Sequence, residues 1–264
     1  MRLGIIGCGT VGGALKKYFE EKTDHELVFR DPAKGLNDSF DGVDAVFVSV
    51  PVPPANDGQD LRALREAVSF AQEYTRKVFV RSTVLPGTND LLSTISCPEF
   101  LTERRAFEDM CALPILVGLT RVAFIKDIFP DKEFIMVSNV EAELAKFAHN
   151  CFGAMKVTYF NMISEIASRI DADYENVLRA ARVTGFINLE HTKVPGPDCN
   201  YGYSGKCFPE NIAAFKNYTK GKLEITDFSD FFRSIERLND IFRSKLVLNT
   251  TKGAINGRKS QAIL

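Results

Sequence analysis

The first residues of the chain carry a pattern that can bind phosphate groups. Gly7, Gly9 and Gly12 are spaced as G-x-G-x-x-G, after a short β-forming run and before a stretch with helical periodicity. A Cβ atom at these positions would block the tight turn and the close approach of a pyrophosphate, and the following helix N-terminus offers unpaired N–H groups. The pattern predicts a dinucleotide site, to which Thr10 and Val11 also belong.

An acidic residue follows this pattern at the distance expected for a ribose ligand. Asp31 lies nineteen residues past Gly12, where its carboxylate would accept hydrogen bonds from the adenosine ribose. This favours NAD over NADP, although the neighbouring Arg30 is a residue type that hosts a 2′-phosphate. A glycine-rich turn without a ligand is the alternative interpretation.

A second reactive residue type occurs late in the chain. Cys207 lies in a run that also contains two glycines and a proline, and a thiolate is a strong nucleophile that traps aldehydes. An unpaired cysteine is more often a small buried apolar residue, and we expect that role for Cys8, Cys97, Cys111 and Cys151. No cysteine or histidine spacing indicates a metal site or a catalytic triad.

These residues need a scaffold, and the first half of the chain alternates β-forming and helical patterns. Helices are expected from the glycine turn to about Glu21 and over Leu61–Tyr74. The expected strands are Arg2–Ile6, Leu27–Phe29, Ala45–Val50, Val78–Arg81, Ile115–Val117 and Phe134–Val137. This alternation predicts an α/β protein with an N-terminal Rossmann-type parallel sheet over residues 1–138.

The second half has a helical character. Apolar residues keep helical spacing over Glu141–Arg169, and a shorter helix is expected at Asp173–Ala181. Residues 184–211 are expected to form a long loop, and helical pattern resumes at Ile212–Lys216 and Phe231–Phe242. We therefore expect residues 139–264 to form an α-helical central domain, built on one long helix, that carries Cys207 in its loop.

Composition narrows the class of protein. The 264 residues are 45% hydrophobic and 25% charged, with a formal net charge of −1, which gives no basis for binding nucleic acid or an anionic membrane. No apolar run approaches the ~20 residues that span a bilayer, and the N-terminus lacks a signal-peptide pattern. Scattered cysteines indicate a reducing compartment. These features predict a cytoplasmic protein.

Further motifs follow one another along the whole chain. They are Val50-Pro51-Val52-Pro53, Ser82-Thr83-Val84-Leu85-Pro86-Gly87-Thr88, Pro98-Glu99-Phe100-Leu101-Thr102-Glu103, Glu143-Leu144-Ala145-Lys146 with Asn150, Val194-Pro195-Gly196-Pro197-Asp198, and Gly202-Tyr203-Ser204-Gly205-Lys206-Cys207-Phe208-Pro209. In this order and spacing they resemble the nucleotide-sugar dehydrogenases, the UDP-glucose/GDP-mannose 6-dehydrogenase family. The resemblance runs from Met1 to about Phe242 and is strongest to short, phage-carried forms without the C-terminal nucleotide-binding domain. If the chain is phage-encoded, the expected compartment is the host cytoplasm.

The resemblance implies an activity and a set of catalytic residues. The family oxidises a primary alcohol of a nucleotide sugar to a carboxylate with NAD, in polysaccharide biosynthesis. Cys207 matches the nucleophile that forms a thiohemiacetal and then a thioester, and Glu99 matches the acid/base that helps water to hydrolyse it. Lys146 and Asn150 match the pair that stabilises the oxyanion, and Thr83 matches a residue that positions water. A nearby ammonium group would stabilise oxyanions, and positions four apart share a helix face.

The remaining site residues and the assembly are also implied by the resemblance. Besides the glycine motif and Asp31, the expected cofactor-binding residues are Val50, Pro51, Ser82, Thr83 and Glu103. The expected substrate-binding residues are Glu99, Phe100, Leu101, Lys146, Asn150, Tyr203 and Gly205. The family's long helix packs against its copy, so a homodimer through Glu141–Arg169 is expected, with a nucleotide sugar as substrate and no metal.

The chain departs from the family at four positions. Asn211 replaces the aspartate that helps to remove the proton of the substrate hydroxyl, and asparagine cannot accept a proton at neutral pH. Glu210 replaces a lysine, Ser204 replaces a glycine, and Phe186 stands where the family has a cation. Three hypotheses follow: a nucleotide-sugar 6-dehydrogenase, a β-hydroxyacid dehydrogenase of similar plan that does not need the Cys207 segment, and an impaired homologue that binds NAD or a nucleotide sugar.

Overall fold

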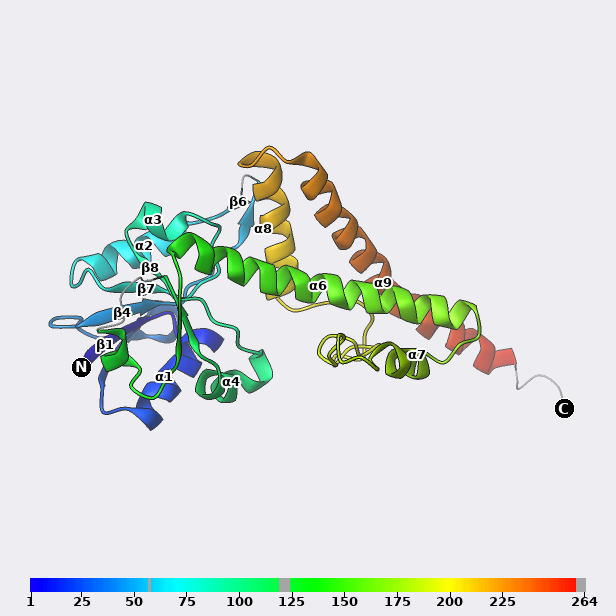
Figure 1. Cartoon of the computed structure of the whole chain (residues 1–264), viewed down its shortest axis with the longest axis horizontal. Helices are drawn as coiled ribbons and strands as arrows, with labels where there is room; N and C mark the ends of the chain where they lie inside the picture. The colour runs from blue at the N-terminus through cyan, green and yellow to red at the C-terminus, as the bar shows by residue number, and fades with distance from the viewer. Residues whose placement is uncertain (57, 119–123, 260–264) are drawn as a thin grey trace. The chain divides into compact units, whose positions relative to one another are not determined.

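The computed structural model describes residues 1–56, 58–118 and 124–259, with side chains as far as residue 245. The chain forms two compact units, Met1–Ala148 and His149–Leu264. Helix α6 (Asn139–Arg169) begins in the first unit and continues into the second (Figure 1). The domain boundary expected after residue 138 stays a prediction.

The first unit is built on a six-stranded sheet. Its strands lie in the order β3 (Leu36–Asn37), β2 (Glu26–Asp31), β1 (Arg2–Ile6), β4 (Ala45–Val48), β7 (Val78–Val80) and β8 (Ile95–Ser96). All neighbouring strands are parallel except β2 and β3. Strand order reverses between β1 and β4, and ligands of parallel sheets bind outside the carboxyl ends of strands at such a point. The expected Rossmann-type parallel sheet is confirmed.

Helices cover both faces of this sheet because its strands are apolar on both sides. On β4, Phe47 packs into one core with Leu15 and Phe19, while Val46 and Val48 pack into another with Leu64. The helices are α1 (Thr10–Lys22), α2 (Arg62–Gln72), α3 (Thr88–Leu92), α4 (Ala106–Ala112), α5 (Ile125–Ile128) and the short turns η1 (Pro32–Lys34) and η2 (Glu103–Arg105). Two small pairs of strands complete the unit, β5 (Pro54–Ala55) with β6 (Gly58–Gln59) and β9 (Ile115–Val117) with β10 (Phe134–Met136).

The second unit is helical, as expected. After α6 come α7 (Tyr174–Ala181), α8 (Cys207–Gly221) and α9 (Thr226–Lys259). Asp173 is the N-cap of α7, and its carboxylate accepts hydrogen bonds from the N–H groups of Glu175 and Asn176.

Two sequence expectations about this unit are wrong. The loop expected over 184–211 ends at residue 206, since α8 begins at Cys207. Pro209 does not prevent this, because it lies in the first turn of α8, where backbone N–H groups have no partner within the helix. Helix α9 extends beyond the expected Phe231–Phe242 at both ends. Residues 226–230 and 243–259, which extend the helix, mix polar and apolar types. None of the described helices combines the length and apolar character that a membrane crossing requires.

Candidate functional site

The glycine motif forms a tight turn between β1 and α1. Gly7 has φ +84°, and an added Cβ atom would lie 2.5 Å from the Ser49 carbonyl oxygen. An added Cβ atom on Gly12 would lie 1.9 Å from the Gly7 carbonyl oxygen. Both glycines are therefore required by the packing of the turn itself.

Gly9 has a different role, because no other part of the protein occupies the space beside it. It is the N-cap of α1 with φ −72°, and an added Cβ atom would meet nothing within 4 Å. No side chain caps this helix, and its first turn carries no acidic residue. The turn thus offers backbone N–H groups and the positive end of a helix dipole to an anion, as a pyrophosphate requires.

Asp31 lies beside this turn at the end of β2. Its carboxylate accepts a hydrogen bond of 2.9 Å from the Cys8 N–H. Lys34 in η1, which the sequence analysis missed, donates to the Cys8 carbonyl. In the sequence, the only indication of a role for Lys34 is its position shortly after Asp31. Arg30 is engaged elsewhere, since it stacks on the Phe70 ring at 4.1 Å and donates to Asn37. These contacts agree with the prediction of NAD over NADP, which stays a prediction.

A second set of predicted residues follows the carboxyl ends of β4 and β7. The Ser82 hydroxyl donates to the Val50 carbonyl at 2.6 Å, which joins the two segments. Gln59 donates to the Thr83 carbonyl at 3.0 Å and accepts from the Leu85 N–H at 2.8 Å. Gln59, a residue that no motif indicated, therefore holds the backbone that carries Thr83.

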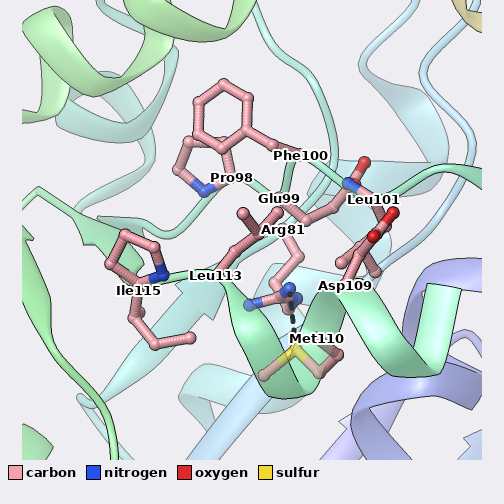
Figure 2. Close-up of a pocket in the computed structure, with 10 residues that line it drawn as sticks. Arg81, Pro98, Glu99, Phe100, Leu101, Asp109, Met110, Leu113 and Ile115 are labelled. Atoms are coloured by element: carbon pink, nitrogen blue, oxygen red, sulfur yellow. Dashed lines mark hydrogen bonds between the residues drawn. The ribbon is translucent and has the colours of Figure 1, made fainter. Parts of the chain in front are cut away.

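Glu99 and Lys146 form a buried ion pair. Lys146 Nζ lies 3.4 Å from Glu99 Oε1, and the two side chains are only 5% and 9% exposed. Glu99 also accepts a hydrogen bond from the Leu101 N–H, and the Lys146 ammonium lies 5.2 Å from the centre of the Phe100 ring. Figure 2 shows Glu99, Phe100 and Leu101 around one small cavity. Two residues that the sequence placed 47 positions apart are thus in contact.

The first turns of α6 are fixed to the loop after β7. Glu143 accepts hydrogen bonds from the N–H groups of Gly87 at 2.6 Å and Asn89 at 2.7 Å, and from the Asn89 side-chain amide at 2.7 Å. Burial raises the pKa of Glu143, and these three donors oppose that effect. Glu143 thereby fixes the helix that carries Lys146 to the segment that carries Thr83.

Cys207 and Asn211 lie one turn apart at the start of α8, in the second unit. Cys207 is exposed at the first position of the helix, where the helix dipole favours a thiolate. Asn211 is buried, and its side-chain carbonyl accepts a hydrogen bond of 2.5 Å from the Asn150 amide. Asn150 therefore lies beside the residue that replaces the family's aspartate.

The segment before α8 is held by asparagine side chains. Asn239 accepts from the Tyr203 N–H at 2.7 Å and donates to its carbonyl at 3.1 Å. Gly205 has a φ of +78°, which glycine adopts without strain. Ser204 does not have a positive φ. The serine therefore causes no strain here. Phe186 is 92% exposed.

The predicted residues thus fall into separate groups. The cofactor residues of the glycine turn and Asp31 come together, Val50 contacts Ser82, and Lys146 contacts Glu99, all in the first unit. Glu103 is exposed in η2. Asn150 contacts Asn211 in the second unit, which also holds Cys207, Tyr203 and Gly205. The roles assigned to all these residues stay predictions. In the described part of the chain, no group of His, Cys, Asp or Glu is arranged to hold a metal.

The sheet order, the glycine turn and the long helix after the sheet define a two-part α/β protein of the dinucleotide-binding type. Comparison with known proteins is more specific. Residues 140–240 match the UDP-glucose/GDP-mannose dehydrogenase family, central domain. UDP-glucose 6-dehydrogenase of Rhizobium meliloti is 30% identical over 242 residues, which cover 76% of this chain and 54% of the relative. The Rickettsia typhi enzyme of that name is 29% identical over 205 residues, or 69% of this chain and 46% of the relative.

A solved structure of a UDP-glucose dehydrogenase from Pyrobaculum islandicum shares the fold, with a TM-score of 0.77 at 24% identity, over 91% of this chain and 68% of that chain. The chain is thus similar to the nucleotide-sugar dehydrogenases, in sequence to the central domain of that family and in fold to a solved member. It spans about half the length of the curated relatives it matches.

Proposed function

We propose that this protein is an NAD-dependent oxidoreductase that converts a primary alcohol of a nucleotide sugar, of the UDP-glucose type, to a carboxylate. The buried Lys146–Glu99 pair carries the proposal. A buried ion pair is weak evidence for stability, because desolvation costs about as much as the attraction returns. A buried carboxylate beside an ammonium group does suit acid/base work and oxyanion stabilisation. The match of residues 140–240 to the central domain of the UDP-glucose/GDP-mannose dehydrogenase family supports the same assignment.

The glycine turn supports NAD as the cofactor. The space beside Gly9 and the uncapped N-terminus of α1 would admit a pyrophosphate, and Asp31 lies within reach of the same turn to accept hydrogen bonds from a ribose. When bound, NAD supplies the hydride acceptor for both oxidation steps. The six cysteines are all thiols, which fits a reducing compartment such as the cytoplasm.

The chain's own residues would carry the covalent chemistry. The Cys207 thiolate adds to the aldehyde carbon, and the resulting oxyanion is stabilised by Lys146 and Asn150. Loss of a second hydride leaves a thioester on Cys207. Water, positioned by Thr83 and assisted by Glu99, then hydrolyses the thioester to the carboxylate and regenerates the thiol. Tyr203, Gly205, Phe100 and Leu101 are proposed to contact the sugar nucleotide.

The proposal is tested by incubating the protein with NAD and a panel of UDP- and GDP-sugars while absorbance of NADH is followed. We expect NADH and sugar acid in a ratio of about two to one with the correct substrate, as two hydride transfers require. Cys207→Ser is the matched control, because it removes the trap for the aldehyde but leaves the cofactor residues intact. Acid formation at an unchanged rate in this variant would refute the covalent route.

A second candidate function is that of a binding protein without turnover, and Asn211 favours it. Asn211 is buried and its carbonyl is already bonded to Asn150, so neither atom of its amide serves as a base. Calorimetric binding of NAD or a nucleotide sugar, with no NADH released even by Asn211→Asp, would support this candidate over the enzyme.

A further inference from the structure

The largest fully buried side chain in the described part of the chain is a cation. Arg81 follows β7 directly, its backbone N–H donates to the Val48 carbonyl at 2.8 Å, and its side chain is buried beneath the segment that carries Glu99. Figure 2 shows the guanidinium directed towards the sulfur of Met110. A buried charge lowers stability unless a partner neutralises it.

Arg81 has no such partner among the described residues. Its guanidinium donates to Cys97 Sγ at 3.5 Å and to Met110 Sδ at 3.7 Å, and its Nε atom has no hydrogen-bond partner. Sulfur is a weak acceptor. Burial raises the pKa of Cys97 despite Arg81, so this thiol is neutral at pH 7. Nothing in contact with Arg81 therefore carries a compensating charge.

Two carboxylates border the same cavity as Arg81. The cavity measures about 10 Å³ and its other walls are mostly apolar, so a charge there acts through a low dielectric. Asp109 is already satisfied by Arg105 at 2.8 Å and by the Thr102 N–H at 2.8 Å. Glu99 has Lys146 as its cation, at 3.4 Å. The nearby Lys132 is bonded to the carbonyls of Cys111 and Leu113.

We propose that Arg81 is a reserve counter-charge for Glu99, used when Lys146 turns from Glu99 to a negatively charged reaction partner. The purpose of this arrangement rests on the proposed function, in which Lys146 stabilises an oxyanion. Lys146 has three N–H donors, but its single positive charge cannot neutralise both Glu99 and an oxyanion at once. An unpaired guanidinium on the same cavity keeps Glu99 compensated during that step, so Arg81 is a positioning residue that acts through Glu99.

A thermodynamic cycle tests this proposal without substrate. The melting temperatures (Tm) of Arg81→Met, Lys146→Met and the double variant are compared with that of the unaltered protein. Methionine fills a similar space among sulfur and apolar groups, so Arg81→Met alone is expected to keep or raise Tm. Lys146→Met alone lowers Tm modestly, because Arg81 still borders the same cavity as Glu99. The double variant loses on the order of 5 °C beyond the sum of the single effects, because Glu99 then has no cation.

Two controls make this result specific. In a Glu99→Gln background, the double variant should lose no more Tm than the sum of the two single variants, since no carboxylate remains to be compensated. Arg105→Met replaces Arg81→Met in a matched cycle, and its effect should add to that of Lys146→Met, because Arg105 serves Asp109. A cycle that is additive for Arg81, or an Arg81→Met variant that fails to fold, would overturn the proposal.

Turnover provides a second readout. Arg81→Met is expected to lower kcat for conversion of the 6-aldehyde to the acid by at least tenfold while the KM for NAD is unchanged, and Arg81→Lys should restore part of kcat. If only the proposed function is wrong, no variant will turn over substrate, but the double variant will still lose more Tm than the sum of the single variants. Turnover that is unchanged in Arg81→Met would contradict the role assigned to Arg81.

Discussion

Asn211 differs from an aspartate by one atom, because an amide nitrogen replaces a carboxylate oxygen. Its position is suited to an acid, because it is buried one turn after Cys207 and its carbonyl oxygen accepts the Asn150 amide at 2.5 Å. An aspartate would accept the same hydrogen bond and would have a second oxygen free to take a proton. The contact with Asn150 is therefore compatible with either residue.

We expect Asn211→Asp to accelerate oxidation of the alcohol. The first step needs the hydroxyl proton removed as hydride leaves, and loss of a positioned base costs ~10²–10⁴ in rate. The second step starts from the thiohemiacetal on Cys207 and depends mainly on Glu99 and water. The unaltered protein should therefore oxidise the 6-aldehyde faster than the alcohol, and Asn211→Asp should narrow the gap. NADH release from both substrates measures this.

Equal rates on alcohol and aldehyde, unchanged in Asn211→Asp, would show that another group supplies the base. Glu210 needs its own control, because its charge on the same helical turn opposes a new carboxylate. The double variant Asn211→Asp with Glu210→Lys should be faster than Asn211→Asp alone if that repulsion is significant.

At the residue scale, the sequence revealed the groups whose chemistry fixes their type. Gly7 and Gly12 were predicted from the geometry of a turn, and Glu99 and Lys146 from the resemblance, and these two are indeed in contact. Arg81 and Lys34 were not predicted. The interest of Arg81 lies in its missing partner, and that of Lys34 in its contact with the Cys8 carbonyl. Neither can be read from a single sequence, because both depend on the residues that the fold brings near them.

The turn between β1 and α1 allows a clean test of cofactor binding. Gly9→Val should abolish NAD binding, because its side chain would fill the space that a pyrophosphate needs. Unlike changes at Gly7 or Gly12, this substitution meets no protein atom within 4 Å, so the fold should persist. Calorimetry with NAD measures binding, and circular dichroism checks the fold.

Gly13→Ala is the matched control for this substitution. Its Cβ atom would lie 3.8 Å from the Cys8 carbonyl oxygen, which is an ordinary contact, and alanine favours helix. Binding of NAD should therefore survive. Binding that survives in Gly9→Val as well would place the cofactor elsewhere.

The segment before α8 should loosen in acid. Burial opposes ionisation of Asp198, but hydrogen bonds from Arg243, the Asn200 N–H and Ser204 outweigh it and lower the pKa of Asp198 to about 2. Because this pKa lies below the unfolded value near 4, the stabilisation is complete above about pH 4 and is lost as the pH falls towards about 2. The Tm of the unaltered protein should fall towards that of Asp198→Asn over this interval.

Glu190→Gln is the control, since Glu190 is an exposed carboxylate in the same loop. Its Tm should run parallel to that of the unaltered protein across the interval. A difference between the unaltered protein and Asp198→Asn that stays constant from pH 6 to pH 2 would show that Asp198 contributes nothing through its charge.

At the element scale, strands and long helices were predicted well and the ends of the later helices were not. Apolar strands such as β1 and β4 are recognisable because both faces are buried. The start of α8 was missed because Gly205 and Pro209 indicate a loop until the structure shows Pro209 in a first helical turn. Short pieces such as α5 and η2 are set by tertiary contacts and carry too few residues for a periodic signal.

The whole molecule leaves part of α6 uncovered, and this bears on assembly. Phe152 is 63% exposed, Tyr159 53% and Ile166 50%. Phe152 and Tyr159 also line an apolar groove of about 600 Å³ in the second unit. Exposed apolar surface of this extent is typical of an interface between chains, which agrees with the homodimer implied by the family resemblance.

We expect a dimer by light scattering at micromolar concentration. Phe152→Glu should shift the protein to a monomer, because a charge would be buried at the interface. Ser168→Glu adds the same charge at an exposed polar position of α6 and should leave the dimer intact. A monomeric unaltered protein would contradict this prediction.

The exposure of the cysteines offers a further use of this chain. Among the six thiols only Cys199 and Cys207 are exposed, Cys111 is half-buried, and Cys8, Cys97 and Cys151 are buried. With Cys199→Ser in place, a maleimide dye or an electrophilic fragment will attach to Cys207 well ahead of the other thiols. Intact mass spectrometry of that adduct then measures the fraction of the protein with a reactive Cys207, and covalent fragment libraries can be screened against this position without a known substrate.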